Sequence, residues 1–158
     1  MGSVKIELKW AVVFTIIGLV WMYFEKLMGW HDEHIDQHYI FTNLFAIIAI
    51  ALYVLALLDK RNNYYGGIIT YKHAFLSGLI LTAFITIWAP LSQYITSTII
   101  TPYYFDKVID YTVENGLKSR QEAESYFNLE NYIWQSVIGA LIMGIITSAL
   151  VSIFIRRK

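Results

Sequence analysis

The 158-residue sequence has no cysteine, only two prolines and few charged side chains. Without cysteine the chain cannot form disulfides, thiolate metal sites or a cysteine nucleophile, although its redox environment stays open. Charged residues make up 15% of the chain and cancel to a formal net charge of zero, which gives no basis for nucleic-acid binding. A Walker loop, a dinucleotide-binding glycine pattern and a nucleophile elbow are also missing, so the sequence does not predict an enzyme.

Apolar residues dominate the sequence instead. They make up 57% of the chain, aromatic residues make up 16%, and the mean hydropathy is +0.50. Such a composition is too apolar for an ordinary soluble domain. The stretch from Tyr39 to Leu58 contains no charge, and as a helix it would be about 30 Å long, which matches the hydrocarbon thickness of a bilayer. Residues 1–158 are therefore predicted to form one membrane domain, with the lipid bilayer as its main partner.

Four apolar stretches are long enough to span a membrane. The predicted spans are residues 8–29, 33–58, 73–100 and 131–155. Pro90 in the third stretch predicts a kink. The charged segment 102–128 predicts two short amphipathic helices, of which Ser119 and Glu122 would cap the second. The sequence thus predicts an all-α, integral membrane four-helix bundle with short amphipathic helices between spans three and four.

Basic residues gather on one predicted side of the membrane. Two lysines lie at the N-terminus, three basic residues lie between spans two and three, and three close the C-terminus. Because basic segments stay in the cytoplasm, the N- and C-termini are predicted to be cytoplasmic. A secretory signal peptide is the alternative for the first apolar stretch, but no small-residue cleavage pattern follows it.

Small residues recur every four positions in the third and fourth spans. Such stripes allow close approach of helix backbones, which is a main source of helix association in lipid. We expect spans three and four to pack on each other; the alternative is that a stripe faces a second copy or another membrane protein. The stripes consist of Ala74, Gly78, Thr82 and Thr86 in the third span and Ser136, Ala140, Gly144, Ser148 and Ser152 in the fourth.

The segment 31–38, HDEHIDQH, carries the most reactive side chains. If this segment is helical, His31, His34 and His38 lie within about 60° of one another. Three imidazoles on one face can bind zinc or another divalent metal and leave a coordination position open. The spacing differs from the zinc-protease motif. The alternatives are a solvated polar cap at a helix N-terminus and a pH-sensing cluster.

Glu25 and Asn43 are polar residues at predicted membrane depth. Such residues face partners or water inside a bundle, and they often mark functional sites. For Glu25, hydration near the end of its span is the alternative. Asn43 is expected to bond to a neighbouring helix.

A family resemblance covers nearly the whole chain. The stretch 66–79, GGIITYKHAFLSGL, the sequence Pro102-Tyr103-Tyr104 and the basic C-terminus resemble the bacterial membrane family catalogued as domain of unknown function 4199. This resemblance implies a small four-span protein of the bacterial inner membrane with a helical insert between spans three and four. It implies no activity.

Two functions are predicted from these residues. The first is a scaffold or accessory protein that acts through contacts between helices or with partners, without a cofactor. The alternative is a transporter-like or divalent-metal-responsive membrane protein that uses His31, His34 and His38.

Overall fold

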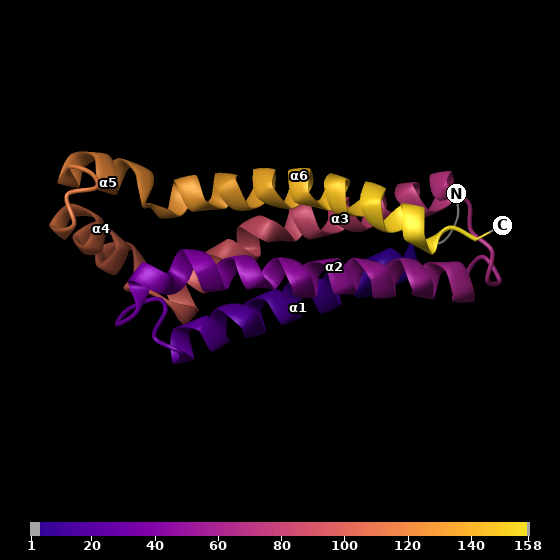
Figure 1. Cartoon of the computed structure of the whole chain (residues 1–158), viewed down its shortest axis with the longest axis horizontal. Helices are drawn as coiled ribbons and strands as arrows, with labels where there is room; N and C mark the ends of the chain where they lie inside the picture. The colour runs from indigo at the N-terminus through magenta and orange to yellow at the C-terminus, as the bar shows by residue number, and fades with distance from the viewer. Residues whose placement is uncertain (1–3, 158) are drawn as a thin grey trace.

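The computed structural model describes residues 4–157, which fold almost entirely into helices. Four long helices form a bundle and run along the long axis of the molecule (Figure 1). They are α1 (Lys5–Leu27), α2 (His38–Asn63), α3 (Tyr71–Ile95) and α6 (Leu129–Ile155). All four are long and apolar enough to cross a membrane. The prediction of an all-α bundle with four spans is confirmed, and by these criteria the chain is a multi-pass membrane protein.

The two ends of the bundle differ in what they carry. Both termini and the connection between α2 and α3 lie at one end, which we call the terminal end (Figure 1). Two short helices, α4 (Tyr104–Glu114) and α5 (Arg120–Tyr126), lie at the opposite end, which we call the insert end. The predicted pair of short helices is thus present. Ser119 and Glu122 form the predicted capping box at the start of α5.

The start of the second span differs from the prediction. A helix from residue 33 was expected, but α2 begins at His38, after a short 3-10 helix at Ile35–Gln37. Gly29 adopts a positive φ of 74°, which ends the regular path of α1. Trp30 then stacks flat on Phe41 of α2, with ring centroids 3.9 Å apart. The following residues therefore form turns rather than a helix.

The third span ends in an irregular turn. Pro90 lies inside α3, and a π-helix, Thr96–Ile100, follows directly. A π-helical turn adds a residue to the helical ladder and is frequent at functional sites. Here Thr96 and Ser97 of this turn are both buried. The turn thus points polar side chains into the insert end of the bundle.

The closest packing lies between α3 and α6 in the terminal half. A Cβ atom on Gly78 would lie 2.6 Å from the Cβ of Ser148, so only glycine fits there. Thr82 Oγ1 lies 3.4 Å from Ser148 Oγ and 2.9 Å from the hydroxyl of Tyr53 in α2. The two small-residue stripes therefore meet within one chain.

The buried apolar core lies mainly on the terminal side of the bundle. Its members come from all four long helices and from the connection that precedes α3. They are Ala11, Tyr53, Ala56, Leu57, Ile69, Ala74, Leu81, Ile85, Val151 and Ile155. The insert half has fewer buried apolar side chains, and this is where the cavities described below are found.

Candidate functional site

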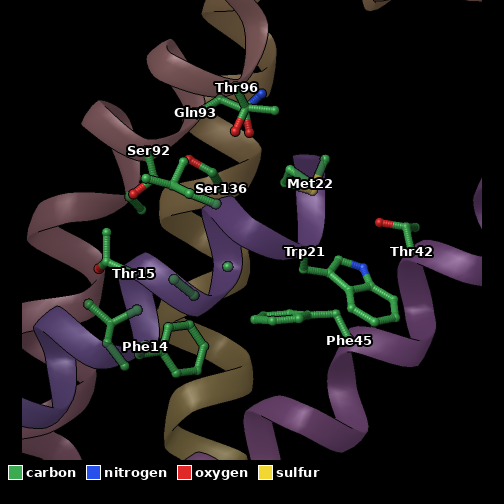
Figure 2. A pocket seen from close by; sticks show the side chains of 15 residues that line it. Phe14, Thr15, Trp21, Met22, Thr42, Phe45, Ser92, Gln93, Thr96 and Ser136 are labelled. Atoms are coloured by element: carbon green, nitrogen blue, oxygen red, sulfur yellow. The ribbon is translucent and has the colours of Figure 1, made fainter. Parts of the chain in front are cut away.

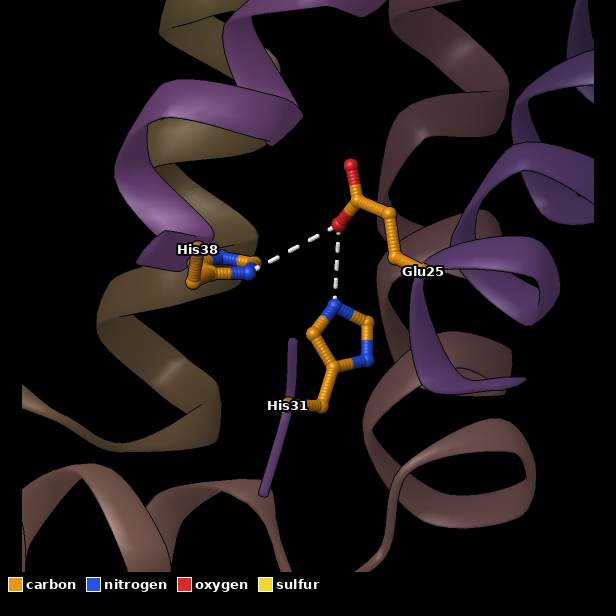
Figure 3. Close-up of side chains that lie close together, drawn as sticks. All are labelled: Glu25, His31 and His38. Atoms are coloured by element: carbon orange, nitrogen blue, oxygen red, sulfur yellow. Dashed lines mark hydrogen bonds and ion pairs between the residues drawn. The ribbon is translucent and has the colours of Figure 1, made fainter. Parts of the chain in front are cut away.

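Three ionisable side chains meet at the insert end of the bundle (Figure 3). Glu25 comes from α1, His31 from the loop after it, and His38 is the first residue of α2. Glu25 is completely buried. Its Oε2 atom lies 2.9 Å from His31 Nε2 and 3.6 Å from His38 Nδ1. One ligand atom from each residue lies within 4.8 Å of the other two.

Aromatic side chains close this cluster. Trp21 Nε1 donates a hydrogen bond to the second carboxylate oxygen of Glu25. The Tyr104 ring lies 5.5 and 5.2 Å from the two imidazole rings, measured between centroids. Burial, with the nearby Tyr132 hydroxyl, raises the pKa of Tyr104 well above its ordinary value. Tyr104 therefore stays a neutral phenol and adds no charge to the cluster.

An exposed ion pair links α4 to the loop beside the cluster. Lys107 Nζ in α4 lies 2.8 Å from a carboxylate oxygen of Asp32, in the loop that carries His31. Both side chains are more than half exposed, so this pair adds little to stability. It does link the loop to the short helix that supplies Tyr104.

The cluster fits the requirements of a divalent metal ion. Tetrahedral zinc with bonds of about 2.0–2.1 Å places its ligand atoms roughly 3.3 Å apart. The distances from Glu25 Oε2 to His31 and His38, 2.9 and 3.6 Å, lie on either side of this value. The three ligand atoms lie within 4.8 Å of one another, so the two imidazoles would move closer together around a bound ion. His38 Nδ1 is buried, has no hydrogen-bond partner among the described residues, and points at the Glu25 carboxylate (Figure 3). Two histidines and one carboxylate form a known zinc donor set that leaves a fourth position for another ligand.

The structure changes the ligand set that the sequence predicted. His34 lies exposed in the turn after Gly29, and its backbone N–H donates to the Gly29 carbonyl oxygen at 2.8 Å. The expected helical face of three histidines is wrong because the helix begins only at His38. Glu25, expected only as a polar residue at membrane depth, lies beside His31 and His38. The sequence feature that could have predicted this contact is the short loop around Gly29, because it turns the chain back toward the end of α1.

Within residues 4–157, the hydrogen bond of the Asn43 side chain stays inside its own helix. Asn43 is exposed on α2, and its side-chain amide donates to the backbone oxygen of Tyr39 in the same helix. The predicted interhelical bond is therefore wrong.

The small-residue stripes behave differently in the two halves of the bundle. The members buried in the terminal half are Ala74, Gly78, Thr82, Gly144, Ser148 and Ser152. In the insert half, Ser136 and Ala140 line a cavity. Thr86 Oγ1 is buried and lacks a hydrogen-bond partner among the described residues. The stripes thus give close packing at one end and open space at the other.

Three adjoining cavities extend from the cluster into the bundle. The first, about 290 Å³ in volume, has His31 and His38 in its wall. It shares Gln93 and Thr96 with a second cavity of about 310 Å³, which Figure 2 shows. A third cavity of about 350 Å³ shares Phe45 with the second. The cluster therefore lies at one end of a series of three adjoining cavities.

A second buried polar cluster lies at the terminal end, and the sequence did not predict it. Glu7 Oε1 accepts a hydrogen bond from Ser77 Oγ at 2.6 Å and lies 3.0 Å from Lys60 Nζ. All three residues are at most 5% exposed. Glu7 and Lys60 lie just outside the predicted spans 8–29 and 33–58. Glu7 lies five helical turns before Glu25, so both residues lie on the same inward face of α1. This spacing was the sequence feature that could have predicted the burial of Glu7.

Comparison with known proteins identifies the family. Searches of the curated proteins and of the solved structures find no match. The family described as "Protein of unknown function (DUF4199)" matches residues 9–157, which is nearly the whole chain. This match confirms the resemblance noted from the sequence, and the chain belongs to the DUF4199 family.

Proposed function

We propose that this protein binds a divalent transition-metal ion, with zinc as the reference case, through Glu25, His31 and His38. The observation that supports this is the meeting of three ligand-bearing side chains, two of them buried, within 4.8 Å. Ionisable groups buried in a membrane protein are costly and usually functional. A bound cation would neutralise the Glu25 carboxylate and give the unpartnered His38 Nδ1 atom a partner.

Metal binding has more support than conduction of a metal ion through the bundle. The second cavity, which adjoins the cavity at the cluster, has Phe14, Trp21 and Phe45 in its wall. Aromatic walls cannot replace the water molecules that a cation gives up, so they oppose its passage. The proposed role is therefore a metal-dependent site at one end of the membrane domain.

A scaffold or accessory role, whether in a homo-oligomer or with another membrane protein, has less support. The small residues that motivated it contact one another between α3 and α6, as Gly78 and Ser148 do. They are not free to meet a partner there.

We also propose that the protein lies in the bacterial inner membrane with both termini in the cytoplasm. Basic residues at the terminal end support this orientation, because such residues are retained on the cytoplasmic side. The metal centre would then face the opposite side of the membrane.

Calorimetric titration tests the proposal. The purified protein in detergent is titrated with zinc, cobalt, nickel and manganese, beside the variants Glu25→Gln, His31→Ala and His38→Ala. We expect each variant to lose more than about tenfold in zinc affinity, since even outer-shell changes cost that much. His34→Ala is the matched control, because His34 lies in the same segment but is exposed.

Two outcomes would contradict the proposed ligand set. If the unsubstituted protein binds none of the four metals, the metal function is wrong. If His34→Ala weakens zinc binding as much as His38→Ala does, the three-histidine set predicted from the sequence is correct instead.

A further inference from the structure

The second cavity is polar at one end and aromatic at the other. Figure 2 shows Gln93 and Thr96 at one end and the Phe14 ring at the opposite end. Trp21 and Phe45 complete the aromatic part, with ring centroids 6.1 Å apart. The polar end is the one that this cavity shares with the cavity at the metal centre. A molecule that fits this space has a polar head and an apolar body.

The third cavity connects this space to the lipid-facing surface. Its rim includes Ile50 of α2 and Met143 of α6, which are 48% and 55% exposed. Both helices are long and apolar enough to cross the membrane, so the opening between them faces the hydrocarbon of the bilayer. A ligand that enters here must come from the membrane itself.

We propose that the cavities hold a single-chain amphiphile with a carboxylate head, of the fatty-acid class. The hydrocarbon tail lies between the aromatic walls of the second and third cavities. The head reaches the cluster of Glu25, His31 and His38, where it binds the metal ion. This inference rests on the proposed function, because the metal ion supplies the partner of the head.

Charge and size select this class of ligand. A divalent cation held by one carboxylate and two neutral imidazoles keeps a net positive charge, and its open position suits an anionic oxygen. The second and third cavities, of about 310 and 350 Å³, lie at the small end of the range of roughly 300–1,000 Å³ typical of small-molecule sites. Such volumes suit one chain rather than the two chains of a phospholipid.

Tryptophan quenching tests whether a chain enters. The full-length protein is placed in phosphatidylcholine nanodiscs with zinc and titrated with 9,10-dibromostearate, whose mid-chain bromines quench an indole on contact. Trp21 lies in the cavity wall. The Trp21→Phe variant measures the background from the other tryptophans, of which the chain has four besides Trp21. Because this change also removes the hydrogen bond from Trp21 to Glu25, the variant is used only if it still binds zinc by calorimetry. We expect saturable quenching in the unsubstituted protein and only the linear background in this variant.

Filling the cavity supplies a second, independent variant. Ala140 lies in the walls of both the second and the third cavity. The Ala140→Leu substitution would place three further carbon atoms there. Gly139→Leu fills the third cavity at a position where an added Cβ meets no atom within 4 Å. We expect both to weaken saturable quenching by about tenfold or more. Leu141→Phe, on the exposed side of the same helix, is the matched control and should have no effect.

The head group is tested by competition. Stearate should displace the brominated probe, and octadecanol should compete at least about tenfold less well because it carries no charge for the metal ion. Removal of zinc by a chelator, or the His38→Ala substitution, should weaken probe binding by a similar factor.

The outcomes separate this inference from the proposed function. Saturable quenching that needs zinc and is lost on filling the cavity, in variants that still bind zinc by calorimetry, supports it. Linear quenching in a protein that binds zinc overturns the inference and leaves the metal function standing. Equal competition by octadecanol, or quenching independent of zinc, overturns the assignment of the head. A protein that binds no zinc overturns both proposals.

Discussion

The two ends of α1 carry the same residue in opposite settings. Glu7 at the terminal end and Glu25 at the insert end lie on one face of the helix and are 2% and 0% exposed. Glu7 is paired with the ammonium group of Lys60 and the hydroxyl of Ser77. Glu25 instead faces two imidazoles whose Nδ1 atoms have no hydrogen-bond partner in the part of the chain that the structure describes. Burial of a carboxylate therefore does not identify a site by itself; neighbours with unused ligand capacity do.

Helix packing also differs between the two ends: it is tight in the terminal half and loose in the insert half. In the terminal half the stripes of α3 and α6 interlock, as Gly78 and Ser148 do. In the insert half Ser136 and Ala140 of α6 border open space. Unfilled space costs packing energy. The hollow half is thus the part of the bundle that a ligand would stabilise.

The largest expected effect comes from breaking the terminal cluster. Lys60→Met leaves the Glu7 carboxylate buried without its cation, and we expect it to lower the free energy of unfolding by roughly 3–5 kcal/mol. The double variant Glu7→Gln/Lys60→Met should recover most of this loss, because no charge is left unpaired. Both are measured by reversible unfolding in mixed micelles with increasing SDS.

The control for this prediction is an ion pair at the same end whose lysine is exposed. Lys9 pairs with Asp59, but its side chain is 56% exposed. Lys9→Met should therefore cost less than about 1 kcal/mol. If the double variant is as unstable as Lys60→Met alone, the ion pair is not what stabilises this end.

A smaller effect is expected where the stripes meet. A Cβ atom on Gly144 would clash with the side chain of Thr82 and lie 2.8 Å from the Tyr53 hydroxyl. Thr82 is branched at Cβ and 1% exposed, so it has no room to move. Gly144→Ala should lower the free energy of unfolding by about 1–3 kcal/mol.

The matched control lies on the same helix toward the insert end. An added Cβ at Gly139 meets no atom within 4 Å. Gly139→Ala should leave stability unchanged or raise it by up to about 1 kcal/mol, since alanine favours the helix. Equal losses from both alanines would mean that the packing does not differ between the two halves.

The fold could be predicted because its signals are local and strong. Each span is an uninterrupted apolar run, and the bilayer requires such a run to be helical. The pairing of α3 with α6 followed from one further pattern, the four-residue spacing of small residues such as Gly78 and Ser148. Both patterns can be read without knowing which distant residues meet.

The site could be predicted only in part because it depends on a change of chain direction. Helical periodicity was extended through residues 31–38, which grouped His34 with its neighbours. The positive φ of Gly29 and the stacking of Trp30 on α2 end that periodicity. The partner of Glu7, at position 60, could not be predicted because no sequence pattern joins residues so far apart in the chain.

The smallest stability effect should come from Glu25→Gln, the counterpart of a change at Glu7. Without metal, we expect it to alter the free energy of unfolding by less than about 1 kcal/mol. The amide keeps the shape of the side chain and still accepts the Trp21 hydrogen bond, and no buried cation loses its partner. Glu7→Gln, which removes the carboxylate that pairs with the buried Lys60 ammonium group, should cost more.

Added zinc should increase the difference between the effects of substituting Glu7 and Glu25. At about one hundred times its dissociation constant, zinc should stabilise the unsubstituted protein by about 2.7 kcal/mol, and Glu25→Gln should lose this gain. The same unfolding curves, recorded with chelator and with zinc, measure both effects. If Glu25→Gln costs as much as Lys60→Met in the presence of chelator, then Glu25 holds the bundle together as Glu7 does, and the two ends of α1 do not differ in kind.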